Sequence, residues 1–235
     1  MMIEMDSLVK SYGDLTALEI QHLEIPSGES FGLVGNNGAG KTTLFSLVLD
    51  LIAPTAGSIR SRGSEVFRSE HWKAYTGAYL DEKFLIEFLT PSEYFDFVGG
   101  LYRVDWNREN EFSDRFGVFL GDDLLESTKL IRELSKGNQK KVGIAAALLA
   151  HPAVVVLDEP FPHLDPTSVM RLKRILSALR ADPGVTMLIS SHDLTHVTEV
   201  CDRVAILDKG HIVRDLRTDE TTLRELQEYF AVGPD

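Results

Sequence analysis

The sequence predicts an α/β fold, in which helices cover both faces of a mostly parallel sheet. Two observations support this prediction. In the C-terminal half, short apolar runs that read as strands alternate with amphipathic segments of helical period. These runs are continuously apolar, as strands buried on both faces of a parallel sheet usually are. The composition, with 43% hydrophobic and 26% charged residues, fits a globular chain with a full core.

The N-terminal segment reads as a meander of short strands within residues 2–35. The turn signals Tyr12–Asp14 and Pro26–Gly28 separate the strands MIEMDSLVK, TALEIQHLEI and ESFGLVG. A glycine-rich loop and a helix over residues 41–52 follow, and Pro54 and Gly57 close the helix. We therefore expect a β-rich subdomain that leads into a buried strand.

The middle of the chain, residues 84–149, contains several helix-like segments and no good strand. We therefore expect a helical subdomain inserted in a single domain that spans residues 1–235. The core, with its β subdomain, would take residues 1–83 and 150–217, and residues 218–235 would form a C-terminal helix. The expected core elements are strands at 75–80, 153–160, 185–192 and 203–210, helices at 166–180 and 194–201, and a hairpin at 210–216.

The formal net charge of −12 argues against a broad surface for nucleic acid or an anionic membrane, so an anionic ligand would need a local pocket. Cys201 is the only cysteine, which excludes an intrachain disulfide and favours a reducing cytoplasm. The amino end carries Glu4 and Asp6 and does not resemble a secretory signal. The longest apolar stretch, Val142–Leu157, is interrupted by Pro152, so we expect no membrane-spanning segment.

A phosphate-binding loop is predicted between the strand FGLVG and the helix that begins near Lys41. Its sequence, GNNGAGKTT, fits the pattern G-x-x-x-x-G-K-[ST] in the expected context of strand, loop and helix. Glycines allow backbone N–H groups to surround phosphate oxygens, Lys41 can reach the β and γ phosphates, and Thr42 can ligate Mg²⁺. The predicted nucleotide-binding residues of this loop are Gly35, Asn36, Asn37, Gly38, Ala39, Gly40, Lys41, Thr42 and Thr43.

A pair of carboxylates ends the apolar strand in VVVLDEP. Asp158 and Glu159 emerge at the carboxyl end of a parallel strand, where open α/β sheets bind their ligands. We predict that Asp158 holds Mg²⁺ through a bound water and that Glu159 orients and deprotonates an attacking water. The alternative is that the two carboxylates only cap the segment that follows.

Two further residues carry less specific signals. His192 ends the strand MLISSH at the same sheet edge, where a donor could reach a γ-phosphate, although a lone histidine is more often packed or exposed. Tyr12 lies in a turn near the first strand and could stack on an adenine ring. An ordinary exposed turn tyrosine is almost as good an interpretation of that position.

The stretch LSKGNQKKV predicts a second helix N-terminus that faces an anion. Ser135 is the expected N-cap of a helix that starts near Gly137, so unpaired N–H groups and the helix dipole would attract negative charge. The predicted phosphate loop already has its own helix. This second site therefore suggests the nucleotide of another copy of the chain.

Five motifs, in their order and spacing, resemble an ATP-binding cassette ATPase of ABC transporters over residues 2–217. They are Gly35–Thr43, Leu134–Gln139, Val154–Glu159, Asp165 and His192. The resemblance implies a P-loop NTPase (RecA-like) fold, with an antiparallel β subdomain and an inserted α-helical subdomain. It also implies ATP and Mg²⁺ as cofactors, ATP hydrolysis, and a head-to-tail dimer in which each copy covers the nucleotide of the other.

Residue roles follow from the same resemblance. The implied catalytic residues are Glu159 as general base, His192 as γ-phosphate switch, and Lys41. The implied Mg²⁺ ligands are Thr42, Glu82 and Asp158. Besides the phosphate loop, the implied ATP contacts are Tyr12 on the adenine, Ser135, Gly137 and Asn138 from the second copy, and Asp165 in a loop between subunits. Asp165 and Pro166 also read simply as an N-cap and first helical residue.

The sequence departs from the family pattern at four positions. Glu82 stands where glutamine is usual, and although its oxygens can ligate Mg²⁺, it adds a negative charge beside the γ-phosphate. Lys136 and Asn138 replace the commoner glycine and glutamine, and His163 replaces a glycine. The variant LSKGNQ resembles the short bacterial cassettes of ABC-2-type exporters, whose permease is a separate six-helix chain.

A transporter role would require a separate transmembrane permease subunit, and would place the chain peripherally on the cytoplasmic face of the membrane. Ten aromatic residues lie between Phe84 and Phe119, among them Tyr94, Phe95, Phe97 and Trp106; they pack the helical insertion or line a groove for short permease helices. An alternative is a soluble ABC-type assembly factor or clamp, which the lack of a coiled coil, a second cassette and a basic patch disfavours. A regulator without turnover is disfavoured by Asp158 and Glu159.

Overall fold

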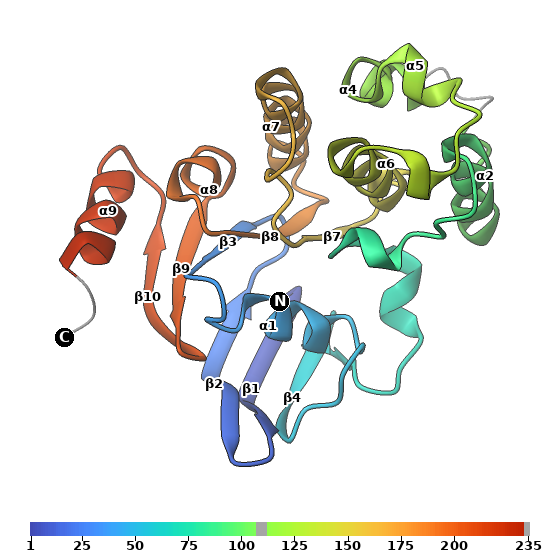
Figure 1. The fold of residues 1–235 in the computed structure, drawn as a ribbon. Coiled ribbons are helices and arrows are strands. Elements are labelled where there is room, and N and C mark those ends of the chain that lie inside the picture. Colours follow the sequence, from blue (N-terminus) through green and yellow to red (C-terminus); the bar gives the residue numbers. More distant parts are fainter. Residues whose placement is uncertain (107–111, 233–235) are drawn as a thin grey trace.

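The computed structural model describes residues 1–106 and 112–232 and contains two sheets with flanking helices (Figure 1). The larger sheet has the strand order β10-β9-β3-β8-β7-β6. Its neighbouring strands are parallel, except that β9 and β10 form the expected antiparallel hairpin. The predicted parallel sheet is thereby confirmed. Its strands are β3 Ser30–Val34, β6 Thr76–Tyr79, β7 Val154–Leu157, β8 Thr186–Ser191, β9 Arg203–Asp208 and β10 His211–Arg217.

The smaller sheet is antiparallel and has the order β2-β1-β4-β5. Its strands are β1 Ile3–Tyr12, β2 Leu15–Ile25, β4 Ala56–Ser61 and β5 Ser64–Glu65. The first two strands were expected from the sequence, whereas β4 and β5 were not. The third strand of the predicted meander, β3, leaves this sheet and becomes a central strand of the larger one.

Strand β4 was missed because only one large apolar residue, Ile59, marks it, and Gly57 was interpreted as the end of a helix. The structure gives Gly57 a φ of 77° and places it against β1, where an added Cβ would lie 2.1 Å from the Ser7 carbonyl oxygen. A glycine is therefore required by close packing of two strands. The helix before it, α1 (Lys41–Val48), is also four residues shorter than the predicted 41–52.

Helices cover both faces of the larger sheet, as expected. On one side lie α6 (Lys136–Leu148), α7 (Pro166–Arg180) and α8 (Leu194–Val200), with α9 (Thr222–Val232) packed against α8. On the other side lie α1 and the antiparallel sheet (Figure 1).

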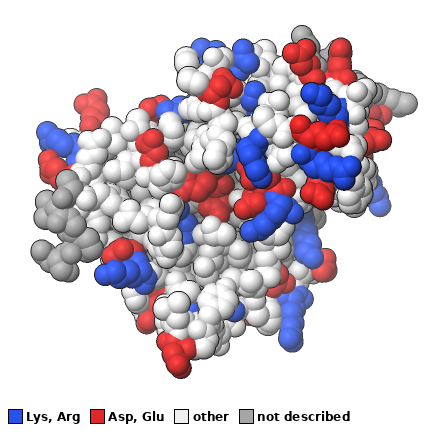
Figure 2. Space-filling model, in the orientation of Figure 1, with Lys and Arg blue, Asp and Glu red and all other residues white. Residues whose placement is uncertain are grey.

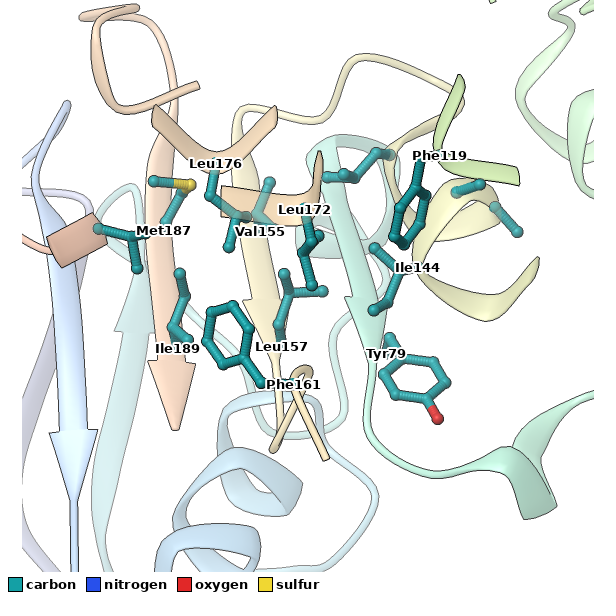
Figure 3. Close-up of a cluster of buried hydrophobic side chains, with 14 of the residues drawn as sticks. Tyr79, Phe119, Ile144, Val155, Leu157, Phe161, Leu172, Leu176, Met187 and Ile189 are labelled. Carbon is teal, nitrogen blue, oxygen red and sulfur yellow. The ribbon is translucent and has the colours of Figure 1, made fainter. Parts of the chain in front are cut away.

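Each side has its own hydrophobic core, and strand β7 contributes alternate residues to the two. Val155 and Leu157 point into the core under α7, where they meet Leu172 and Leu176 (Figure 3). Val154 and Val156 belong to the opposite core, beside α1. Both α7 leucines are fully buried, and each such burial stabilises the fold by roughly 1.5–3 kcal/mol. The strand ends are therefore held rigidly between two packed layers.

The insertion between β6 and β7 contains no strand among its described residues, in agreement with the sequence. Its helical elements are the 3₁₀ turn η2 Glu82–Phe84, α2 Pro91–Tyr102, the π turn η3 Ser113–Gly117, α4 Val118–Leu120, α5 Asp122–Leu125, the 3₁₀ turn η4 Ile131–Glu133 and α6. Phe95 is fully buried and makes edge contacts with Trp106 at 5.4 Å and Phe112 at 5.1 Å. Several predicted aromatics thus pack the insertion, whereas Phe97 is 48% exposed.

Helix α6 joins the insertion to the sheet through a contact that excludes any side chain at Gly77. A Cβ added to Gly77 in β6 would lie 1.8 Å from the carbonyl oxygen of Ala147 near the end of α6. Backbone meets backbone there, so neither partner can move aside as a flexible side chain would. The position of α6 on the sheet depends on this approach.

We predict that Gly77→Ala lowers the free energy of unfolding by about 1–3 kcal/mol, the usual cost of overpacking a core. Urea denaturation followed by circular dichroism measures the change. The control is Gly100→Ala in α2, where an added Cβ meets nothing within 4 Å. That variant should be neutral or stabilising by up to ~1 kcal/mol, because alanine is the better helix former. Equal destabilisation of both variants would contradict the proposed close contact.

Candidate nucleotide and catalytic site

The predicted phosphate loop lies between the carboxyl end of β3 and the start of α1. Gly38 and Gly40 adopt φ values of 84° and 112°, in the region that favours glycine, and Gly40 is the N-cap of α1 without a side-chain cap. At Gly35 an added Cβ would lie 2.3 Å from the Leu207 carbonyl oxygen of β9. The first N–H groups of α1 are therefore available to an anion held by the loop.

Lys41 holds the loop closed from within. Its side chain is 6% exposed, and Nζ donates hydrogen bonds to the carbonyl oxygens of Gly35 at 2.6 Å and Asn36 at 3.3 Å. The same Nζ lies 3.3 Å from Oε1 of Glu159. The predicted phosphate lysine and the predicted base are therefore adjacent.

Asp158 is buried at the end of β7 and accepts hydrogen bonds from two hydroxyl groups. One comes from Thr42 Oγ1 at 2.5 Å and the other from Ser190 Oγ of β8. Burial raises the pKa of the Asp158 carboxyl, and these hydrogen bonds act in the opposite direction. The predicted Mg²⁺ ligands Thr42 and Asp158 are thus brought together.

Ser190 was not predicted from the sequence. Besides donating to Asp158, its Oγ accepts a hydrogen bond from the Glu159 N–H at 2.9 Å. Only its place two residues before His192 at the carboxyl end of a strand could have indicated a role, and that signal is weak.

Glu159 follows in a strained conformation, with a φ of 45° that non-glycine residues rarely adopt. This backbone turns its carboxylate towards His192, whose Nδ1 lies 2.9 Å from Glu159 Oε2. The three predicted catalytic residues, Lys41, Glu159 and His192, therefore form one connected group at the edge of the sheet.

A pocket of about 400 Å³ opens in front of this group. It is lined by Leu15, Thr16, Ala17, Asn37, Gly38, Gly40, Lys41, Thr42, Thr43, Glu159 and Lys209. Tyr12 is absent from the described lining; it ends β1 instead of lying in the turn, and Lys10 Nζ is 4.8 Å from its ring centroid. The sequence did not single out Leu15, which is 67% exposed at the mouth.

The Ser135 segment caps α6 as expected. Ser135 is the N-cap, and its Oγ accepts a hydrogen bond from the Asn138 N–H at 3.3 Å. Gly137 packs against the segment after Glu159, since a Cβ added there would lie 2.5 Å from the His163 carbonyl oxygen. The described lining of the phosphate pocket includes none of these α6 residues.

Asp165 and Glu82 lie on two other segments, and the described lining of the pocket includes neither residue. Asp165 is the N-cap of α7, and its hydrogen bonds with Ser168 lower the pKa of the Asp165 carboxyl. The N-cap interpretation is therefore confirmed. Glu82 begins the turn η2, where its Oε1 lies 4.0 Å from Lys140 Nζ. Lys140 was not predicted from the sequence.

Among the described residues, no helix is long and apolar enough to cross a membrane.

Strand order and phosphate loop together place the chain in the class of P-loop NTPases. Comparison with known sequences narrows this class, because residues 18–162 match the sequence model of the family described as ABC transporter. The chain therefore belongs to the ABC transporter family, as one of its ATP-binding and ATP-hydrolysing cassettes.

Relatives along most of the chain carry names consistent with this family. The ABC transporter ATP-binding protein YhaQ of Bacillus subtilis is 36% identical over 211 residues, which cover 89% of this chain and 69% of YhaQ. The bacitracin transport ATP-binding protein BcrA of Enterococcus faecalis is 31% identical, with 93% of this chain and 70% of BcrA covered. The lantibiotic transport ATP-binding protein SrtF of Streptococcus pyogenes is 29% identical, with 97% and 96% covered.

Solved structures have the same fold. The structure of an ATP-binding subunit of an ABC transporter superimposes with a TM-score of 0.83 at 26% identity, covering 99% of both chains. A dimeric post-hydrolysis state of the cassette MJ0796, bound to ADP and Pi, gives a TM-score of 0.82 at 23% identity, covering 93% of this chain and 99% of that one. The predicted fold class is thereby confirmed.

We predict that Asp158→Asn stabilises the nucleotide-free protein at neutral and higher pH. The folded-state pKa of Asp158 lies above its ordinary value, so the charged carboxylate costs stability above that raised pKa. Asparagine removes the charge and keeps one of the two acceptor oxygens, while its NH2 group can donate to the other hydroxyl oxygen. The gain should shrink as the pH falls through the raised pKa, because the wild-type carboxyl then takes up a proton. Urea denaturation at a series of pH values, without divalent cations, measures both effects.

Asp165→Asn is the matched control, because the pKa of Asp165 is shifted in the opposite direction. The lowered pKa of Asp165 means that its ionised carboxylate stabilises the fold at neutral pH. This contribution disappears as the pH falls through the lowered pKa. Its effect should be small, since asparagine also caps helices well. Destabilisation by Asp158→Asn at pH 8 would show that the hydroxyl contacts outweigh the burial of charge.

Proposed function

We propose that this cassette hydrolyses MgATP between two copies of itself and thereby drives transport through a separate membrane permease. The connected group of Lys41, Glu159 and His192 beside the phosphate loop is the observation that carries the proposal. Lys41 and Glu159 would supply a phosphate contact and a base for water in the pocket, and His192, paired with Glu159, would supply a γ-phosphate contact beside it.

The donor set at the pocket floor fits a magnesium ion. Thr42 and Asp158 provide hydroxyl and carboxylate oxygens, the ligands that Mg²⁺ prefers, and they already touch at 2.5 Å. Mg²⁺ held there would offset the negative charge of the phosphates. The family resemblance adds Glu82 of η2 to the residues that would hold the ion.

The chain's own residues would act in a simple order. Phosphate oxygens in the loop compete with the carbonyl groups of Gly35 and Asn36 for the ammonium of Lys41, and they compete well because they are charged. Glu159 then takes the proton of the attacking water, while His192 stays within hydrogen-bonding distance of Glu159 and contacts the γ-phosphate.

A second copy would complete the site. Ser135 is exposed at the N-terminus of α6, and neither it nor Gly137 lines the phosphate pocket of its own chain. A helix N-terminus attracts phosphate, so the Ser135 segment suits the nucleotide of a partner copy. The dimeric ADP-bound and Pi-bound cassette of the same fold is consistent with this arrangement.

An exposed aromatic groove supports a permease partner. We define the aromatic groove by Phe84, Phe97, Leu101 and Tyr102, which are 54%, 48%, 67% and 37% exposed. Two hollows of about 250 and 320 Å³ share Phe84 and Tyr102 in their linings. The groove adjoins Glu82, so a short amphipathic permease helix seated there would lie next to the nucleotide site.

The surface charge is consistent with a protein partner and no nucleic acid. On the face shown in Figure 2, acidic side chains lie among the lysines and arginines, and no broad basic area forms. Together with the transport names of BcrA and SrtF, this supports a place on the cytoplasmic side of a membrane, beside an ABC-2-type permease.

We predict that Glu159→Gln lowers ATP turnover by at least about 10²-fold, as expected for the loss of a general base, while MgATP binding persists. The uncleaved nucleotide should then trap the dimer. Phosphate release measures turnover, and light scattering with MgATP measures the dimer. Lys41→Ala should instead lose nucleotide affinity itself.

The control for both variants is Glu199→Gln, which removes an exposed carboxylate paired with Lys173 away from the pocket. It should hydrolyse ATP normally. Normal steady-state turnover by Glu159→Gln would contradict the base assignment, and unchanged MgATP binding by Lys41→Ala would contradict the phosphate loop.

We predict that Phe97→Glu combined with Leu101→Glu abolishes co-purification with the permease, because charges would enter an apolar contact. The partner to co-express is a hydrophobic six-helix protein, to be sought among the genes that neighbour the gene of this chain. Val118→Glu is the control, since Val118 is an exposed apolar residue of the insertion outside the groove. Retained co-purification of the double variant would exclude this groove, and no co-purification of the wild type would contradict a permease partner.

A further inference from the structure

Lys140 is a buried lysine of α6 with no role in the mechanism described so far. It is 5% exposed, although lysine is among the residues least often buried. It lies five residues after the N-cap Ser135, so the same helix carries it and the segment proposed to reach a second copy.

The ammonium of Lys140 meets three groups around the catalytic site. Nζ donates a hydrogen bond to the Glu159 carbonyl oxygen at 2.7 Å and lies 4.0 Å from Glu82 Oε1. It also lies 5.7 Å from the ring centroid of Tyr79, which ends β6. Lys140 therefore joins α6, the turn η2 and the catalytic segment at one point.

The burial of this charge requires compensation. Desolvation lowers the pKa of Lys140, and the carboxylates around it, Glu82 first among them, act in the opposite direction. Glu82 is itself only 16% exposed on its side chain. Removal of one partner from a buried pair leaves the other charge uncompensated, which usually costs more than the pair contributes.

We propose that Lys140 is a positioning residue that neutralises Glu82 and fixes the backbone of Glu159, so that Glu82 and Lys140 act as one unit. The proposal rests on the proposed function, since the pair matters for catalysis only if Glu159 is the base. It also explains how this chain tolerates a glutamate beside the γ-phosphate.

Lys140 acts on the conformation of Glu159 through its hydrogen bond to the Glu159 carbonyl oxygen. Glu159 holds a φ of 45°, and such a strained conformation persists only where surrounding contacts impose it. Ser190 holds the N–H of the residue and Lys140 holds its carbonyl group. Both contacts are needed to aim the carboxylate at His192.

The test separates the charge from the hydrogen bond. Lys140→Gln keeps a donor for the Glu159 carbonyl but leaves Glu82 uncompensated, whereas Glu82→Gln with Lys140→Gln removes both charges. We expect Lys140→Gln to lower kcat roughly tenfold with little change in KM for MgATP, and the double variant to recover most of that loss. Lys140→Met, without a donor, should not be rescued by Glu82→Gln.

A second measurement needs no nucleotide or metal. In urea denaturation, Lys140→Gln and Glu82→Gln should each lower the midpoint concentration, and the double variant should lie closer to the wild type than their sum predicts. Lys173→Gln on α7 is the control, because it breaks a lysine–glutamate pair outside the site at 2.7 Å. In the kinetic experiment its turnover should stay unchanged, and in urea its effect should add to that of Glu82→Gln.

Additive effects of Lys140→Gln and Glu82→Gln, on both kcat and the urea midpoint, would overturn the proposal, and so would wild-type turnover by Lys140→Gln. These outcomes are distinguishable from failure of the proposed function. If the proposed function failed, the wild type itself would not hydrolyse ATP, or the Glu159→Gln variant would hydrolyse ATP normally.

Discussion

A cluster of buried charges at the carboxyl edge of the larger sheet is the constraint on which the rest of this structure depends. Lys41, Lys140 and Asp158 are 6%, 5% and 4% exposed. Charges at such depth are tolerated only when they are paired and hydrogen-bonded. Their partners come from the phosphate loop, α1, η2, β8 and the segment after β7. The fold must therefore deliver these separate segments to one place before any chemistry is possible.

Lys41 connects the phosphate loop to Glu159, the proposed base. Its ammonium is shared between the loop carbonyl groups and the Glu159 carboxylate. A triphosphate in the loop would draw the ammonium away, because phosphate oxygens carry more negative charge than a carbonyl group. Glu159 would then keep His192 as its neighbour.

Contiguous motifs were predictable from the sequence, and contacts between distant segments were not. The phosphate loop, the carboxylates after β7 and the capping residues of α6 and α7 are local patterns, and the structure places each where it was expected. Ser190 and Lys140 matter only through partners that are at least 31 and 19 residues away, respectively. Strand β4 was hidden because one of its faces is solvated and its glycine is needed for packing. Tyr12 was placed in a turn because the sequence does not mark the end of β1, which in the structure includes Tyr12.

Helix α6 touches the segment after β7 at two points near its N-terminus. Near its N-terminus, Gly137 meets the His163 carbonyl oxygen so closely that no side chain fits. Just under one turn further on, Lys140 holds the Glu159 carbonyl oxygen. A helix is stiff between Gly137 and Lys140. If a second copy displaced the N-terminus of α6, Lys140 would move with it and shift the backbone of Glu159. Since η2 contacts the same lysine beside the aromatic groove, a partner seated there would act on the same carboxylate through Glu82.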